Sequence, residues 1–600
     1  MNLSPEEKKI GKENFQEAVG TTRRDFLKGG IAATVAAGSI GALGGYYFGY
    51  QKINEPLRVG IIGTGDEGNV LLGALNPEYI DLVALADIRP YSVHRAFYGD
   101  WYSPGAHSAR PGILDVYKKA QGWSDRSAAE KHIKVYNNGY EELLDDPNVE
   151  AVIIALPLHL HHPAALAAMR KGKHVLTEKL MAHDVGQGKE MARAAGKLRD
   201  PDNNPIILAV GHQRHYSILY DNAVDQIKQG LIGKIHHIRA QWHRNNLPGN
   251  DSWQPPLPGQ FMSEEEYTTA LRTARAAGKE AEFKNENKIL GEYYAWLKAS
   301  KDPSLSPAAR EEWDRKVAQK LAQANDITNE LAAKHGYEAK TLGGGYSRSP
   351  LEELIRWRLW QRTGGGLMAE LGSHQLDAAS IFLTAQRPDG RKAKPLAVVA
   401  VGGRSIFPED RECEDHVYCN FEFPGITYYE DEASHKVANP NDKIVVTYSS
   451  INGNGFGGWG EVVFGDKGTL ILEQEQDAML FAGANTGTKV EVKPGKDGKP
   501  SLDTYETGGG AAVAQAATAE VVSRGYREEI EHWAWCIRNP SPEHKPRCRP
   551  EVALADAVIA LTTNLAIAKG GRIDFAPEWF DVESDATPDG SKPAPASNLA

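Results

Sequence analysis

The chain has 600 residues, of which 41% are hydrophobic and 24% are charged, and its formal net charge at pH 7 is −11. A chain of this length is too long to fold around a single hydrophobic core, which predicts roughly two to four structural units. The acidic balance, without a clustered Lys/Arg stripe, argues against nucleic-acid binding. The cysteines form no CxxC pair, so we expect unpaired buried thiols, with a disulfide within Cys413/Cys419 or Cys536/Cys548 as the alternative.

The N-terminal segment has the pattern of an export signal. Arg23 and Arg24 are followed by Phe-Leu-Lys and then by an uncharged, glycine-rich run, Gly29 to Tyr50. This is typical of the twin-arginine signal, which predicts a periplasmic or exported protein that uses the twin-arginine export machinery. The glycines disfavour a membrane-spanning helix, although an uncleaved tether remains the alternative. We assign residues 1–50 to this signal or anchor.

A dinucleotide-binding motif follows. An apolar strand, Leu57 to Ile62, runs into the loop Gly63-Thr64-Gly65-Asp66-Glu67-Gly68 and then into a helical stretch. In such a loop the first glycine permits the turn, the second admits the pyrophosphate and the third lets the helix pack on the strand. A second strand ends at Asp87, where an acid can bind the adenosine ribose hydroxyls, which favours NAD. Arg89 could instead bind a 2′-phosphate, so NADP stays open.

The remaining pattern divides the chain further. Alternating apolar strands and helices predict a Rossmann domain, a doubly wound parallel sheet, over residues 56–231. Residues 232–575 predict an α/β domain with a mainly antiparallel open sheet. Within it, about 246–350 is a charged, Ala-rich helical insertion. It is a solvated spacer or interface, or else a lid that, with Trp253, Trp296 and the Trp357/Trp360 pair, closes over a sugar ring. We expect a disordered tail over 576–600.

Two segments resemble a known family. They are Asp146 to His161 with Gly172 to Leu180, and Gly364 to Asp377. Together they resemble the glucose–fructose oxidoreductase and inositol dehydrogenase (Gfo/Idh/MocA) family over about 56–245 and 350–570. The resemblance implies a catalytic lysine at Lys179, an acid/base pair at Glu370 and His374, and a homo-oligomer formed through the C-terminal sheet. The chain departs from the family where Leu180 replaces proline and Glu370 replaces aspartate.

The residues themselves support a catalytic site at the same place. Lys179 ends a parallel strand, where ligands of such sheets bind. Glu370, His374 and Asp377 have i, i+4, i+7 spacing, which predicts one helical face, and a carboxylate beside an imidazole can orient a general base. Without the resemblance, a solvated lysine and a helix-stabilising glutamate would be the ordinary interpretation. We also assign four residues to the cofactor site: Pro157, His161, Glu178 and Gln213. No metal is expected, because His159, His161 and His162 have no acid or cysteine at ligand spacing.

Three functions fit these features. The first is an NAD(P)-dependent oxidoreductase that transfers a hydride between a tightly bound nicotinamide cofactor and a sugar or polyol. The second is an NAD-dependent glycosidase that works through transient oxidation and elimination. The third is a non-catalytic protein that binds cofactor or sugar. Export favours tight cofactor binding, because the periplasm has no free nicotinamide pool.

Overall fold

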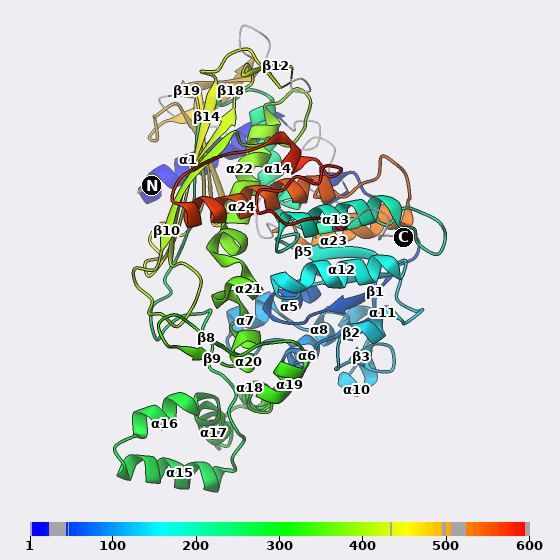
Figure 1. The fold of residues 1–600 in the computed structure, drawn as a ribbon, viewed down its shortest axis with the longest axis vertical. Helices are drawn as coiled ribbons and strands as arrows, with labels where there is room; N and C mark the ends of the chain where they lie inside the picture. The colour runs from blue at the N-terminus through cyan, green and yellow to red at the C-terminus, as the bar shows by residue number, and fades with distance from the viewer. Residues whose placement is uncertain are drawn as a thin grey trace.

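The computed structural model describes residues 3–22, 44–45, 47–431, 435–494, 500–505 and 524–594. The twin-arginine pair and residues 29–43 lie outside these ranges, so the predicted signal remains a prediction. Figure 1 shows a Rossmann domain beside a second sheet domain, with a helical arm that projects from the body. All four cysteines are buried and unpaired, as expected.

The first domain contains a six-stranded parallel sheet of order β3-β2-β1-β4-β5-β6. Its strands are β1 (Leu57–Ile62), β2 (Ile80–Ala86), β3 (Lys134–Tyr136), β4 (Ala151–Ile154), β5 (His174–Glu178) and β6 (Leu208–Gly211). The strand order proceeds in opposite directions from the neighbouring strands β1 and β4. The loops that follow their carboxyl ends therefore separate and leave a crevice for a ligand. The predicted Rossmann fold is confirmed.

Both faces of this sheet are buried, which explains its nearly continuous apolar strands. Val152 and Val175 belong to one core cluster, whereas Ile153 and Leu176 belong to another that includes Trp533. The helices that pack around the sheet are α5 (Asp66–Ala74), α6 (Pro90–Tyr98), α12 (His161–Arg170), α13 (Val185–Lys197), α23 (Tyr526–Arg538) and α24 (Pro550–Lys569), whereas α14 (Ile218–Lys228) packs on the second domain. Helices α23 and α24 come after most strands of the second sheet in the chain and return to the Rossmann domain, so they tie the two domains together.

The second domain is built on an eight-stranded sheet of order β17-β16-β15-β7-β14-β11-β10-β20. Its strands are β7 (Ile235–Arg244), β10 (Ala397–Gly403), β11 (His416–Pro424), β14 (Lys443–Asn452), β15 (Trp459–Gly465), β16 (Gly468–Glu473), β17 (Asp477–Ala482) and β20 (Arg572–Asp574). Only the β7–β14 pair in this sheet is parallel, which confirms the mainly antiparallel prediction. Helix α22 (Ser373–Ala385) packs on one face, and the other face exposes Val399, Val401 and Tyr418.

The insertion forms a helical arm and a docked base. The helices are α15 (Glu264–Ala276), α16 (Glu280–Glu286), α17 (Lys288–Ser300), α18 (Pro307–Ala324), α19 (Asn329–Lys334) and α20 (Pro350–Ile355). Helices α15, α16 and α17 project from the body at the bottom of Figure 1. Helix α18, however, packs on α6 of the Rossmann domain, and Gln319 donates a hydrogen bond to Asp100 at 2.8 Å. The base of the insertion is therefore part of the globular body.

Both ends of the described chain are packed. Near the N-terminus, α1 (Pro5–Thr22) lies on β17, where Asn14 donates a hydrogen bond to the Leu480 carbonyl at 3.0 Å. Residues 576–594 differ from the expected disordered tail, because the Lys189 ammonium donates to the carbonyls of Glu578, Ser584 and Ala586. Phe580 is buried in the core and Trp579 packs against it, and neither these contacts nor the bonds from Lys189 can be read from the composition of the segment.

One helix among the described residues, α24, is long and apolar enough to cross a membrane. In the structure 72% of its apolar window is buried against the protein.

Candidate active site

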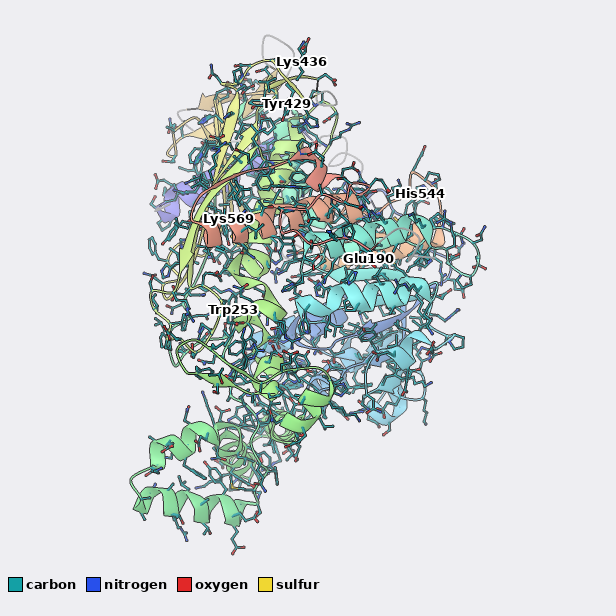
Figure 2. All side chains as sticks on the ribbon, in the orientation of Figure 1. Glu190, Trp253, Tyr429, Lys436, His544 and Lys569 are labelled. Carbon is teal, nitrogen blue, oxygen red and sulfur yellow. The ribbon has the colours of Figure 1, made fainter. Side chains whose placement is uncertain are left out.

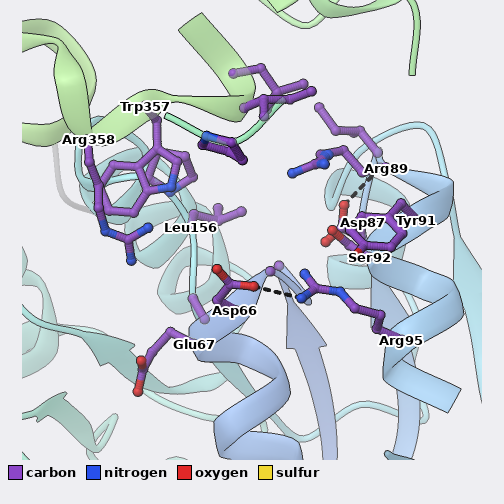
Figure 3. Close-up of a pocket in the computed structure, with 18 of the residues that line it drawn as sticks. Asp66, Glu67, Asp87, Arg89, Tyr91, Ser92, Arg95, Leu156, Trp357 and Arg358 are labelled. Atoms are coloured by element: carbon purple, nitrogen blue, oxygen red, sulfur yellow. Dashed lines mark hydrogen bonds and ion pairs between the residues drawn. The ribbon is translucent and has the colours of Figure 1, made fainter. Parts of the chain in front are cut away.

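A cleft of ≈ 1310 Å³ lies between the Rossmann domain and the second sheet, and the base of the insertion forms a third wall. Figure 3 shows part of it, with Asp66 and Glu67 below, Asp87, Arg89 and Arg95 on one side, and Trp357 and Arg358 on the other. The cleft is lined by most of the predicted cofactor residues: Gly63, Gly65, Asp66, Glu67, Asp87, Arg89, Pro157, His161, Glu178 and Lys179. Thr64, Gly68 and Gln213 do not line it.

The three glycines of the loop meet distinct geometric demands. Gly63 has φ +88°, and a Cβ there would lie 2.4 Å from the Ala155 carbonyl oxygen. A Cβ on Gly68 would lie 2.1 Å from the Gly63 carbonyl oxygen, so only glycine lets α5 approach β1. A Cβ on Gly65 would meet nothing within 4 Å, and this residue faces the cleft. Helix α5 starts at the next residue, so its free N–H groups face the space that a pyrophosphate would fill.

The carboxylate of Asp87 is held at the end of β2. One oxygen accepts hydrogen bonds from the Thr64 N–H at 2.7 Å and the Thr64 hydroxyl at 3.0 Å, and the other accepts from the Arg89 N–H at 2.8 Å. Thr64 thus orients Asp87 from below the cleft surface. Asp87 retains lone pairs on the cleft side, where they can accept hydrogen bonds from ribose hydroxyls.

Arg89 binds the insertion. Its guanidinium donates through Nε at 2.9 Å and Nη2 at 2.6 Å to the Asp326 carboxylate, which is almost completely buried. Both N–H groups donate to the same oxygen, Oδ2, and a buried charge-assisted contact of this kind is strong. This pair could not be predicted from the sequence, because Arg89 and Asp326 are separated by more than two hundred positions.

The acidic side chains at and beside the glycine loop have shifted pKa values. Asp66 forms an ion pair with Arg95 at 2.7 Å (Figure 3), and this guanidinium holds the pKa of Asp66 well below its usual value. Burial raises the pKa of Glu67, and burial together with Glu67 raises that of Glu178 well above the usual range. These shifts favour the uncharged forms of Glu67 and Glu178, and an uncharged carboxyl group beside the loop would not repel a pyrophosphate.

Lys179 follows β5 and reaches the second domain. Its ammonium donates to the Glu370 carbonyl oxygen at 2.7 Å and lies 3.8 Å from the Glu370 carboxylate. That carboxylate accepts a hydrogen bond from Arg358 Nε at 2.6 Å. Burial alone would raise the pKa of Glu370, but Arg358 and Lys179 outweigh it and lower the pKa to about 2. Glu370 is therefore an anion that positions two cations, and it does not carry a proton at neutral pH.

His374 lies beside this cluster. Residues Met368–Gly372 form a π-helical turn that leads into α22, and such turns occur frequently at functional sites. Arg214 donates to the His374 carbonyl at 2.8 Å and is itself held by Glu461 and Glu475. Burial, with the Lys179 ammonium and the Arg214 guanidinium, lowers the pKa of His374 well below its usual value. The imidazole is neutral and can accept a proton.

Two predicted residues lie elsewhere. Asp377 does not line the cleft with His374: it lies one turn further along α22 and binds Lys392 at 2.6 Å and His215 at 3.0 Å. Gln213 is buried behind the cleft wall. Both are corrections to the predicted site. The helical spacing gave the right face, but the attraction of Lys392 and His215 directs Asp377 into the core.

The three sequence histidines do not converge on one site. The ring nitrogens of His161 lie 2.8 Å from the Leu180 and Leu156 carbonyl oxygens, whereas His162 lies 3.1 Å from Glu190. His161 therefore holds the backbone just after Lys179, where the Lys179–Leu180 peptide is cis. Asp377 and Asp556 do lie near His212 and His215 in metal-like groupings, but the Lys392 ammonium binds both carboxylates at 2.6 and 2.7 Å.

Several cleft residues escaped the sequence interpretation: Trp242, Arg244, Arg358, Arg524 and Tyr526. Of the predicted lid tryptophans, Trp253 (labelled in Figure 2) and Trp357 line the cleft, whereas Trp360 is fully buried and Trp296 packs with Trp313 in the helical arm. The insertion thus contributes walls to the cleft.

Residues 57–200 match the family model GFO_IDH_MocA, described as an oxidoreductase family with an NAD-binding Rossmann fold. Residues 57–200 are therefore similar to the NAD-binding Rossmann domain of an oxidoreductase family. This match lies wholly within the six-stranded sheet domain described above. The match supports the family resemblance seen in the sequence over residues 57–200.

Individual relatives match over shorter spans. An uncharacterized oxidoreductase of Schizosaccharomyces pombe is 31% identical over 157 residues, 25% of this chain and 41% of that protein. A glycosyl hydrolase family 109 protein of Solibacter usitatus is 28% identical over 244 residues, 38% of this chain and 46% of that protein. The chain thus spans less than half of the length of these relatives. The solved aldose-aldose oxidoreductase from Caulobacter crescentus, complexed with glycerol, is 16% identical, with 87% of this chain and 100% of that chain covered and a TM-score of 0.46.

The glycine loop yields a direct test. Gly65→Ala places a methyl group where the structure has open space, so we expect unchanged thermal stability of the cofactor-free protein. The same methyl group excludes the close approach of a pyrophosphate, so NADH affinity should fall by at least about tenfold. NADH fluorescence titration, on protein freed of its own nucleotide, measures the affinity.

Gly196→Ala in α13 is the matched control, because its Cβ also meets nothing within 4 Å and it lies away from the cleft. Unchanged NADH affinity in Gly65→Ala would contradict a cofactor on this loop.

Proposed function

We propose that the protein is an NAD-dependent oxidoreductase that transfers a hydride between the cofactor and a hydroxyl or carbonyl carbon of a sugar or polyol. One observation carries the proposal: the Lys179 ammonium lies at the carboxyl end of β5, in the same cleft as Gly63 and Gly65, and within reach of Glu370 and beside His374. A bound NAD would accept the hydride. The chain must then supply the proton chemistry of the hydroxyl.

The cleft residues divide that work. The Lys179 ammonium can donate a hydrogen bond to the substrate oxygen and stabilise the negative charge that develops as its proton leaves. The neutral His374 ring can accept this proton. Glu370 fixes the lysine from the second domain, and Arg358 fixes Glu370. In the reverse direction the same groups return the proton to a carbonyl oxygen.

The proposal predicts a large effect at Lys179. Lys179→Ala should lower turnover by at least about 100-fold, because it removes the cation beside the reacting oxygen, while NADH still binds. NADH absorbance over a panel of sugars and polyols measures turnover. Lys171→Ala, an exposed lysine just before β5, should leave turnover unchanged. A Lys179→Ala variant as active as the wild type would refute the catalytic role of Lys179, whereas a wild type that binds NADH but turns over none of the panel would leave a binding protein as the better description.

A redox-assisted glycosidase is the second candidate, favoured by the likeness to a glycosyl hydrolase family 109 protein. Both activities use transient or net oxidation of a sugar carbon, but only the glycosidase releases an aglycone while the cofactor returns to its starting state. Nitrophenyl glycosides separate them. Nitrophenol release without net NADH would replace the dehydrogenase assignment with the glycosidase.

We further propose that the cofactor is NAD and not NADP. The Asp87 carboxylate faces the ribose end of the cleft, where it would repel a 2′-phosphate. Arg89, which could otherwise attract that phosphate, is bound by Asp326 of the insertion. The insertion thereby supports the choice of cofactor.

Removing the Asp326 charge should weaken that preference. Asp326→Asn leaves Arg89 without its carboxylate, so we expect the ratio of NADPH to NADH affinity to rise roughly tenfold. Fluorescence titration with both nucleotides measures the ratio. Glu311→Gln, on an exposed part of the same insertion, is the control. An unchanged ratio would show that Arg89 does not take part in the discrimination.

We also propose that Arg23 and Arg24 direct export of the folded protein with a tightly bound cofactor. Replacing both with lysine should keep the protein in the cytoplasmic fraction. A wild-type protein found only in the cytoplasm would contradict export.

The exposed Val399, Val401 and Tyr418 support association of copies through the second sheet, which a solely monomeric sedimentation profile would contradict.

A further inference from the structure

The cleft contains a cation without an anionic partner. Arg244 ends β7 and lines the cleft on the side of the second sheet. The other cleft arginines all have carboxylate partners: Arg89 with Asp326, Arg95 with Asp66, Arg110 with Asp100, Arg358 with Glu370 and Arg524 with Glu475. Across the described part of the chain, no carboxylate lies within ion-pair distance of Arg244, and no protein group forms a hydrogen bond with its guanidinium.

Two indole rings hold this guanidinium in place. Its central carbon lies 5.6 Å from the ring centroid of Trp242 and 5.6 Å from that of Trp253. Both tryptophans are buried. Aromatic faces attract a cation, but they do not satisfy its five N–H donors. The planar donor edge of Arg244 is therefore preorganised and unused.

The carboxylates near Arg244 already bind other cations. Asp251 lies on the loop after β7, but its carboxylate binds Arg411 at 2.6 Å. Glu370 is bound by Arg358 and Lys179. Arg244 is partly exposed in the cleft, so its guanidinium is open to an anionic ligand that could supply the missing partner.

The position of Arg244 relates this ligand to the reacting groups. The Trp242 ring, which faces Arg244, also lies 5.4 Å from the ring of His374. One indole thus lies against both the free cation and the proposed base. Arg244 is on the side of the second sheet, whereas the glycine loop belongs to the Rossmann domain, so the pyrophosphate of a dinucleotide does not supply the anion.

We propose that the substrate is a sugar acid whose carboxylate binds Arg244 while a ring or chain hydroxyl faces Lys179 and His374. One free guanidinium matches one negative charge, and its planar fork matches a carboxylate in a bidentate geometry. A phosphate ester would bring more charge than the single free cation balances. The inference rests on the proposed function and names the substrate class of the same site.

The test compares ligands that differ only in this charge. Calorimetric titration of the NAD-loaded protein uses glucuronate against glucose and galacturonate against galactose, with glucose 6-phosphate as a third anion. We expect at least one sugar acid to bind at least tenfold more tightly than its neutral partner, because charge-assisted hydrogen bonds are strong. Arg244→Gln should reduce this ratio to near one, and Arg244→Lys should keep part of it.

Arg239→Gln is the matched control. Arg239 lies on the same strand, five positions earlier and so on the opposite face, and it does not line the cleft. This variant should keep the wild-type ratio. Calorimetric binding of NADH to Arg244→Gln at wild-type affinity would show that the variant is folded.

Three outcomes would overturn the proposal: no preference for either acid in the wild type, a preference that survives Arg244→Gln, or tighter binding of glucose 6-phosphate than of both sugar acids. Each would leave the dehydrogenase assignment intact if NADH still binds and Lys179 is still required. Loss of the Lys179 requirement, by contrast, would count against the proposed function itself.

Discussion

The hydrogen bond from the Lys179 ammonium to the Glu370 carbonyl joins the two halves of the site. Lys179 follows a strand of the Rossmann sheet, whereas Glu370 belongs to the π-helical turn just before α22 in the second domain. This contact places the end of β5 against His374 and carries the lysine across the cleft. The donor is a flexible side chain and the acceptor is a backbone atom, so Arg358 and His161 are needed to fix the surroundings on either side.

The electrostatics of the cleft follow from this contact. Glu370 stays ionised because two cations surround it, and His374 stays neutral because it is buried among cations. Burial raises the pKa of Glu67, and burial together with Glu67 raises the pKa of Glu178, which favours the uncharged forms of both side chains. The result is a cleft that favours negative charge at the glycine loop, beside Lys179 and at Arg244. A dinucleotide, a developing alkoxide and a carboxylate would each find a matching region.

The sequence predicted the parts of this site that depend on local rules. The turn at Gly63 and the tight packing at Gly68 are visible in the motif, and the strand preceding Lys179 is visible in its apolar pattern. The two sheets were predicted from periodicity. The position of Asp377 was wrong, because helical spacing gives a face but not the partners, Lys392 and His215, that decide where the side chain turns.

Long-range contacts could not be predicted in the same way. The Arg89–Asp326 pair, the packing of 576–594 on Lys189 and the tryptophans around Arg244 each join segments that are distant in sequence or depend on the tertiary fold. The insertion illustrates the point: its composition suggests a solvated spacer, yet its base lines the cleft. Only α15, α16 and α17 project from the body as the composition suggests (Figure 1).

The account depends on a nicotinamide ring at the junction of the two domains, and a crystal structure with bound NADH tests this most directly. We predict that the pyrophosphate lies over Gly65, the adenosine ribose beside Asp87, and the nicotinamide ring against Lys179 and His374. A complex whose nicotinamide ring lies away from both of these side chains would contradict the central claim.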